Sequence, residues 1–272
     1  MSIEILTLLF FGSRLLFLVL GLPLTFVLGG VSVVFLYFTW GFDSFYMVAS
    51  QIWGTMGSFT LVAIPLFILL GEILLLAGIA ERMYGAMVEW LSWLPGGTMH
   101  SNIGSCAIFA ASSGSSVATA ATVGTVAYPE IARRGYNEPL FLGTLAAGGT
   151  LGILIPPSIN LIIYGLLTDT SVPQLYLAGF IPGLTWAILF RLTILIGVLI
   201  KPAWGGEPVQ TSWPARWKTL PNLLPPLGIF VVVVGSIYAG IATPTEAASV
   251  GVVAALCLAA SFRALNWNML RE

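Results

Sequence analysis

An uncharged run with a polar centre constrains the fold of this chain more than any other feature. Residues 102–128 contain no Asp, Glu, Lys or Arg, and SSGSS at 112–116 lies in their middle. The arms at 101–111 and 117–127 have about 11 residues each, or roughly 16 Å as α-helix, which is about half the hydrocarbon core of a bilayer. The pattern predicts a re-entrant helical hairpin over residues 98–130. Its tip is tolerated at membrane depth only where protein or a wet cavity surrounds it.

The composition indicates a membrane protein. The chain is 58% hydrophobic and 8% charged, whereas about a quarter of the residues of a soluble domain are charged. The net charge of -1 offers no basic surface for nucleic acid. Cys106 and Cys257 lie in apolar segments and predict neither a disulfide framework nor a metal site. We therefore expect an all-α polytopic membrane protein without an organic cofactor.

The remaining apolar segments set the expected topology. Residues 41–57 mix polar and aromatic side chains and residues 81–94 are amphipathic, so both segments are expected to lie at the membrane interface. Since a span needs roughly 20 apolar residues, the sequence predicts spans at 5–20, 23–40, 61–79, 174–200, 223–240 and 245–262, and a broken span at 140–167.

A polar linker at 201–219 divides the chain into two predicted repeats. The first covers residues 1–200, and 220–272 is expected to begin the second with two spans. GIATP at 240–244 echoes GLP at 21–23, each before an apolar span, which favours repeats of inverted topology.

The basic residues indicate an orientation. If the hairpin enters from the cytoplasm, eight of the ten Lys and Arg residues fall on that side, as the positive-inside rule expects, and the N-terminus is periplasmic. These eight are Arg82, Arg133, Arg134, Lys201, Arg216, Lys218, Arg263 and Arg271.

A second interruption lies at Pro156 and Pro157. The prolines lack the amide hydrogens that would bond to the carbonyls of Gly152 and Ile153, and the glycines before them allow unusual backbone angles. We expect an unwound stretch whose neutral oxygens, with those of the hairpin tip, suit a hard cation such as Na⁺. Close packing of small residues and a tolerated Pro kink would explain either element alone. The candidate cation ligands are Ser113, Gly114, Ser115, Ser116, Gly148, Gly149, Thr150, Gly152 and Ile153.

Two acids lie at or near membrane depth, where ionisable groups are costly and often functional. Glu72 is a candidate for coupling to protons or Na⁺, or alternatively a structural carboxylate bonded to a helix end, to Arg14 or to Arg191. Glu246 follows Thr243 by three residues, which is the spacing of a helix capping box.

Nothing in the sequence predicts an enzyme. His100 is the only histidine, and it precedes Ser113 by about 13 residues, or roughly 20 Å along a helix, too far for a serine–histidine dyad. Zinc-protease and phosphate-loop motifs are absent from the sequence. Two interrupted helices in one apolar chain are typical of secondary transporters with sites near the bilayer midplane. Because no ATPase motif is found in the sequence, energy for transport would come from an ion gradient.

Four motifs carry a family resemblance. IPLFILLGE at 64–72, SGSSVATAAT at 113–122, GTLAAGGTLGILIPPS at 143–158 and ATPTEAA at 242–248 resemble the large membrane subunit of tripartite ATP-independent periplasmic (TRAP) transporters. The resemblance implies a Na⁺-driven importer of C4-dicarboxylates or other organic acids in the bacterial inner membrane, working by an elevator mechanism. It also implies two partners, a small four-helix membrane subunit and a periplasmic solute-binding protein.

The resemblance also places the sites. It implies a first Na⁺ site between the tip at 113–116 and an unwound segment at 148–157. The substrate is expected beside the ion, at Ser116, Thr119, Pro156, Pro157 and Ser158.

Members of that family are roughly half as long again, so the chain is expected to stop within the second repeat, with 266–272 in a loop. The alternative function is a non-transporting scaffold or half-transporter that requires a second polypeptide.

Overall fold

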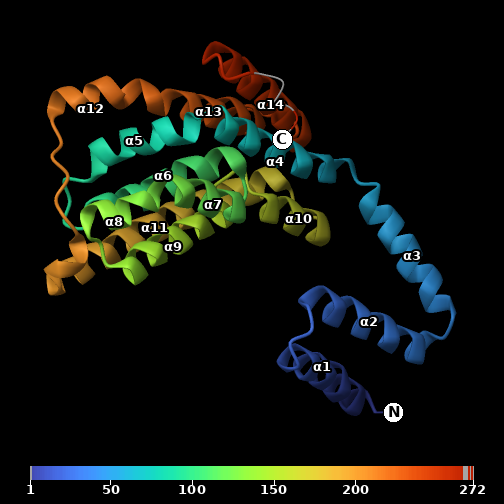
Figure 1. Cartoon of the computed structure of the whole chain (residues 1–272). Helices are drawn as coiled ribbons and strands as arrows, with labels where there is room; N and C mark the ends of the chain where they lie inside the picture. The colour runs from blue at the N-terminus through green and yellow to red at the C-terminus, as the bar shows by residue number, and fades with distance from the viewer. Residues whose placement is uncertain (1, 266–268, 270, 272) are drawn as a thin grey trace. The chain divides into compact units, whose positions relative to one another are not determined.

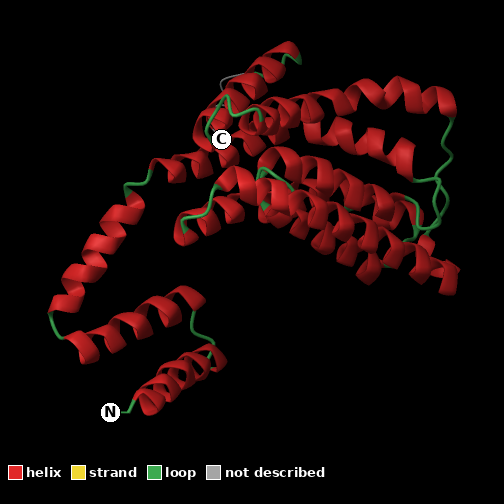
Figure 2. Cartoon of the chain, turned by 180° about the vertical axis from the view of Figure 1, so that it is seen from behind, coloured by secondary structure: helices red, strands yellow, loops and turns green. Residues whose placement is uncertain are grey.

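The computed structural model describes residues 2–265, 269 and 271. Over these residues the chain consists of helices joined by loops, without a strand (Figure 2). The predicted all-α class is confirmed. The chain divides into two compact units, Met1–Ser58 and Phe59–Glu272.

The first unit contains three helices, α1 (Ile3–Val19), α2 (Leu24–Trp40) and α3 (Asp43–Met56). The Arg14 side chain donates to the Ser32 hydroxyl at 2.6 Å, which joins α1 to α2. Helices α1 and α2 have 17 residues each, or about 26 Å, slightly less than a bilayer core. Their assignment as spans stays a prediction.

The second unit builds a layered helical bundle. Helix α6 packs against α5, α7, α9 and α11, and α14 packs against α4 and α13 (Figure 1). Its helices are η1 (Phe59–Val62), α4 (Ala63–Leu76), α5 (Ile79–Leu91), α6 (Thr98–Ser113), α7 (Ser116–Ala127), α8 (Pro129–Arg134), α9 (Glu138–Leu154), α10 (Ile159–Thr168), α11 (Val172–Ile200), η2 (Pro202–Gly205), α12 (Trp213–Thr219), η3 (Leu220–Leu223), α13 (Leu224–Tyr238) and α14 (Pro244–Ser261).

Several helices are long and apolar enough to cross a bilayer. Among the described residues these are Phe59–Leu76, Val172–Ile200, Trp213–Tyr238 and Pro244–Ser261, and α9 with α10 add a fifth if the bent pair is one span. A multi-pass membrane protein follows from these lengths and compositions.

The polar linker is shorter than the sequence predicts. Helix α12 runs through η3 into α13, so helical structure begins at Trp213 and not near residue 223. Ser212 starts this helix by accepting from the Ala215 amide at 3.3 Å, as N-cap serines do. The predicted repeat boundary at 201–219 stays a prediction, as does the loop at 266–272, where only Met269 and Arg271 are described.

The two echoed segments form the same turn. Gly21 and Gly240 have φ of +79° and +69°. The amide of each glycine donates to the carbonyl three residues before it, and the amide of the following residue donates to the carbonyl five residues before itself. This hydrogen-bonding pattern ends a helix in a Schellman turn. The local likeness of the two segments therefore extends from sequence to backbone.

Candidate functional site

The hairpin is tighter than its sequence predicts. Helix α6 continues to Ser113 and α7 begins at Ser116, so only Gly114 and Ser115 lie between them. Gly114 has φ of +66°, a left-handed conformation that glycine adopts without steric cost. Two residues reverse the chain where the sequence predicted a five-residue non-helical tip.

Hydroxyl groups and a carbonyl gather at the tip. The Thr119 hydroxyl donates to the Ser115 carbonyl at 2.6 Å and lies 3.2 Å from the Ser113 hydroxyl. Because Thr119 uses its hydrogen on Ser115, Ser113 is the donor of this pair. The Ser115 hydroxyl accepts from the Ala118 amide at 3.3 Å and caps α7. Ser113 and Thr119 are buried, so the tip is a compact set of neutral oxygens.

The bent helix breaks later than expected. Helix α9 stays helical to Leu154, and residues 155–158 separate it from α10 at a bend of 41°. The predicted unwinding from Gly148 is therefore wrong. The Ile153 carbonyl, expected to be free, accepts from the Ser158 hydroxyl at 2.6 Å. The prolines disturb the four residues at the break and leave the preceding turns intact.

The glycines of α9 serve close packing. A Cβ on Gly152 would lie 2.9 Å from the carbonyl carbon of Ser115, and one on Gly149 would lie 2.7 Å from the Ala120 Cβ. A Cβ on Gly148 would lie 2.8 Å from the Cys106 sulfur. These distances are too short for any side chain. The glycine face of α9 therefore lets the hairpin approach backbone to backbone.

The tip meets the break directly. The Ile159 amide donates to the Gly114 carbonyl at 3.0 Å, and a Cβ on Gly114 would lie 2.8 Å from the Pro157 carbonyl oxygen. Thr150 is instead exposed, and its hydroxyl donates to the Ala147 carbonyl at 2.6 Å. The structure brings together Ser113, Gly114, Ser115, Ser116, Thr119, Gly149, Gly152, Pro157 and Ser158, with Pro156 buried in the break.

The acidic candidates have different surroundings. Glu72 is exposed on α4, next to Gly71, where a Cβ would lie 2.9 Å from the Ser113 Cβ. Glu72 therefore lies at the depth of the tip. Glu246 accepts from the Thr243 amide and hydroxyl, both at 2.8 Å, in the capping box that its spacing predicts.

Helix α11 packs against the break, a contact that the sequence does not predict. A Cβ on Gly179 would lie 2.6 Å from the Leu154 carbonyl oxygen, and one on Gly183 would lie 2.8 Å from the Ile155 side chain. Tyr176, one turn before Gly179, is fully buried. A Tyr/Gly/Gly stripe at intervals of three and four residues was the available signal.

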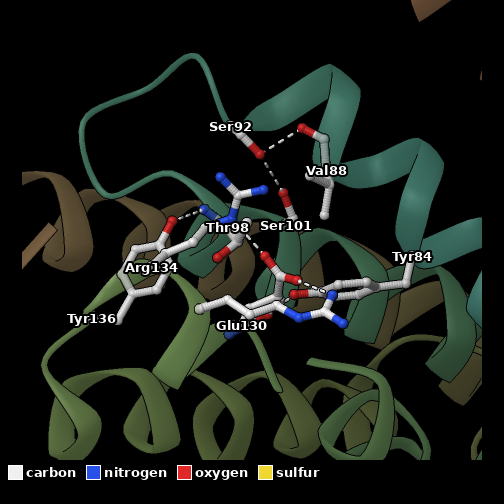
Figure 3. A network of polar contacts seen from close by, with 10 residues as sticks. Tyr84, Val88, Ser92, Thr98, Ser101, Glu130, Arg134 and Tyr136 are labelled. Atoms are coloured by element: carbon white, nitrogen blue, oxygen red, sulfur yellow. Dashed lines mark hydrogen bonds and ion pairs between the residues drawn. The ribbon is translucent and has the colours of Figure 1, made fainter. Parts of the chain in front are cut away.

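The hairpin base is held by side chains (Figure 3). The Tyr84 hydroxyl donates to the side-chain oxygen Oδ1 of Asn102, and the side-chain nitrogen Nδ2 of Asn102 donates to the Thr144 hydroxyl, both at 2.9 Å. The Tyr136 hydroxyl accepts from the Thr98 amide at 2.9 Å. This buried set ties α6 to α5, to α9 and to the loop before α9.

His100 also belongs to the base. Its Nε2 lies 2.9 Å from the Pro95 carbonyl, which only accepts, so Nε2 carries the hydrogen. Burial lowers the pKa of His100 below its ordinary value, and the positive charge of Arg191 adds a smaller effect in the same direction. The hydrogen bond to Pro95 opposes them. The imidazole is neutral at neutral pH.

A separate cavity of about 720 Å³ lies away from the tip. It is lined by residues of the loops before α11 and α14, among them Asp169 and Ile241. The tip and the break are joined by direct contacts and do not line it.

The fold and the tip–break contact define a multi-pass membrane protein of the transporter class. The chain matches the family described as "Tripartite ATP-independent periplasmic transporter, DctM component" over residues 11–272 and belongs to that family. The family is a transporter permease and not an enzyme, so the expected absence of catalysis agrees with membership.

Curated relatives extend the comparison. The C4-dicarboxylate TRAP transporter large permease protein DctM of Vibrio cholerae is 35% identical over 240 residues, which cover 87% of this chain and 52% of the relative. The ectoine TRAP transporter large permease protein TeaC of Halomonas elongata is 32% identical, over 89% of this chain and 56% of the relative. The sialic acid TRAP transporter large permease protein SiaM of Vibrio cholerae is 33% identical, over 88% of this chain and 55% of the relative. The chain spans little more than half the length of these relatives.

Proposed function

We propose that this chain contributes a Na⁺ site to a secondary transporter that imports organic acids across the bacterial inner membrane. The contact between the hairpin tip and the helix break carries the proposal. It joins neutral hydroxyl and carbonyl oxygens from Ser113, Ser115 and Thr119 with the backbone at Pro157. Oxygens of this kind suit a hard cation, and interrupted helices supply such sites in secondary transporters.

The substrate would lie beside the ion. The substrates in the names of the relatives are C4-dicarboxylates, ectoine and sialic acid, each with a carboxylate. The start of α7 offers amide groups and a positive dipole end that favour a carboxylate, next to Ser116 and Thr119. Pro156, Pro157 and Ser158 would form the opposite wall.

The proposed mechanism is of the elevator type. Hairpin, break and α11 pack through glycines with no room for a side chain, which favours movement as one body. The partners would be a small four-helix membrane subunit and a periplasmic solute-binding protein, and the N-terminus would be periplasmic. Na⁺ would be the coupling ion, with no other cofactor.

The alternative is a half-transporter or scaffold that needs a second polypeptide. This chain matches 52% to 56% of the length of these relatives. Transport of a labelled dicarboxylate by this chain with the small membrane subunit and the binding protein, and without any further polypeptide, would exclude the alternative.

The thermal midpoint Tm in NaCl against KCl at equal ionic strength tests the ion site. A ligand that binds only the folded state raises stability by RT ln(1 + [L]/Kd), about 1.4 kcal/mol at a tenfold excess over Kd. We expect a Na⁺-specific rise that the double variant Ser115→Ala, Ser116→Ala loses.

A matched control separates the ion from the fold. Ser236→Ala with Ser261→Ala removes two hydroxyls that bond only to their own helices, at 2.8 and 2.7 Å. The control should keep the full Na⁺ increment. Equal Tm values for the native chain in NaCl and KCl would refute the ion site.

A further inference from the structure

Arg14 places a charge inside the apolar hairpin of α1 and α2. Its guanidinium carbon lies 3.7 Å from the centre of the Phe10 ring, and one terminal nitrogen donates to the Ser32 hydroxyl at 2.6 Å. The Nε atom is buried and has no acceptor among the described residues. A guanidinium carries five N–H donors, so a ring and one hydroxyl leave most of them unused. Within a membrane span a charge of this kind is costly and is almost always paired.

The side chain points toward the middle of its helix. Val19 ends α1 five residues after Arg14, or about 8 Å along the axis, and an Arg near a helix end usually extends to the nearer interface. Arg14 instead leans back onto Phe10, near the middle of the 17 residues of α1. Because the core is about 30 Å thick, headgroup phosphates lie roughly 15 Å from that depth. Lipid phosphate therefore does not meet the guanidinium there.

The first unit supplies no carboxylate for this charge. Glu4 and Asp43 are the only acids in residues 1–58, and Arg14 makes no ion pair with a described residue. Glu4 lies ten residues before Arg14, roughly 15 Å along α1. Asp43 begins α3, eleven residues after Ser32. A second copy of the hairpin would bring another Arg and no acid at this depth, so the charge favours a different partner.

An apolar groove starts at the residues that hold the guanidinium. It lies between α1 and α2, and its volume is about 380 Å³. Its wall offers leucine and phenylalanine side chains to an apolar helix, but no further charge to a free organic acid. The lining includes Leu6, Phe10, Phe11, Ser32, Phe35 and Leu36.

We propose that the α1–α2 hairpin docks a membrane-spanning helix of a second polypeptide, whose Asp or Glu near mid-span pairs with Arg14. Apolar side chains of that helix fill the groove, and its carboxylate accepts from Nε and a terminal nitrogen in the paired geometry that guanidinium favours. Of the two proposed partners, the small membrane subunit is the one that spans the bilayer and would supply the helix. That last step rests on the proposed function.

A synthetic helix tests the pairing. The probe is a leucine–alanine peptide of about 21 residues, long enough to span a bilayer, with one central Glu and a fluorescent acceptor at one end. Its counterpart has Gln at the central position. Binding to the native chain in phosphatidylcholine vesicles is followed by energy transfer from the tryptophans of the chain. We expect the Glu peptide to bind about tenfold or more tightly than the Gln peptide, because charge-assisted hydrogen bonds are roughly twice as strong as neutral ones.

Variants assign the preference to Arg14. Arg14→Gln should bind both peptides equally weakly, whereas Arg14→Lys keeps the charge and should still prefer the Glu peptide. Arg191→Gln is the matched control, because Arg191 is the other Arg within a predicted span and belongs to α11. It should keep the full preference.

Three results would overturn the inference. They are equal binding of the two peptides to the native chain, a Glu preference that persists in Arg14→Gln, and a preference abolished by Arg191→Gln. Release of the Glu peptide by free succinate would also contradict it, because the groove would then be a site for a small acid. The assay is run in KCl, so none of these results depends on the proposed Na⁺ site.

Discussion

The two ends of the hairpin are built in opposite ways. The base is held by buried side chains that exchange hydrogen bonds across helices, with Asn102 between Tyr84 and Thr144. The tip is held by backbone, through the bond from the Ile159 amide to the Gly114 carbonyl and through glycines that admit no Cβ.

The difference separates anchoring from binding. Side-chain networks fix one geometry, because a lost partner leaves a buried polar group unpaired. A tip of small neutral residues keeps carbonyl and hydroxyl lone pairs close together without a fixed charge. The base should therefore determine whether the bundle folds, and the tip should determine what it binds.

The largest expected effect is at the base. Asn102→Ala would leave the Tyr84 and Thr144 hydroxyls without their shared partner. We expect unfolding to be easier by about 2–4 kcal/mol, measured by chemical denaturation in detergent. The Na⁺ increment in Tm should survive in whatever fraction folds. Loss of the Na⁺ increment in Tm in the folded Asn102→Ala variant would contradict the division between base and tip.

A smaller effect is expected at the tip. Gly152→Ala places a Cβ 2.9 Å from backbone atoms of Ser115 and Ser116, and overpacking of this kind costs about 1–3 kcal/mol. The same substitution at Gly143 in the same helix meets nothing within 4 Å. It should be neutral or stabilising by up to about 1 kcal/mol. Equal Tm changes for the two variants would show that the hairpin does not press on α9.

The Gly152→Ala variant also tests whether Na⁺ binds where the tip meets the break. Because it displaces the tip from the break, it should reduce the Na⁺ increment in Tm, whereas Gly143→Ala should keep it. A Na⁺ increment that survives unchanged in Gly152→Ala would place the ion elsewhere.

The smallest expected effect is a pH dependence from the base. Since the pKa of His100 is lowered in the folded protein, the unfolded state binds more protons as pH falls through the ordinary value of about 6.5. Stability should fall as pH is lowered from 7 to 5. His100→Gln, which keeps a donor for Pro95, should flatten that part of the profile. A profile unchanged in this variant would assign the dependence to other groups.

The sequence predicted elements better than contacts. The uncharged run placed the hairpin, and Pro156 and Pro157 placed the break within a few residues. The glycines of α9 were expected to loosen the helix, and this expectation was wrong. They serve close packing against the hairpin, which is visible only in three dimensions. Tyr176 and Gly179 were missed for the same reason, since an apolar span gives no sign of what lies against it.

The most direct test of the joined site is amide hydrogen exchange in NaCl against KCl. Na⁺ should slow exchange in residues 113–119 and 155–162 together, because one ion would hold both segments. The base peptide at 98–104 should exchange at the same rate in both salts. Protection confined to one of the two segments, or spread evenly over the chain, would contradict a cation site between the tip and the break.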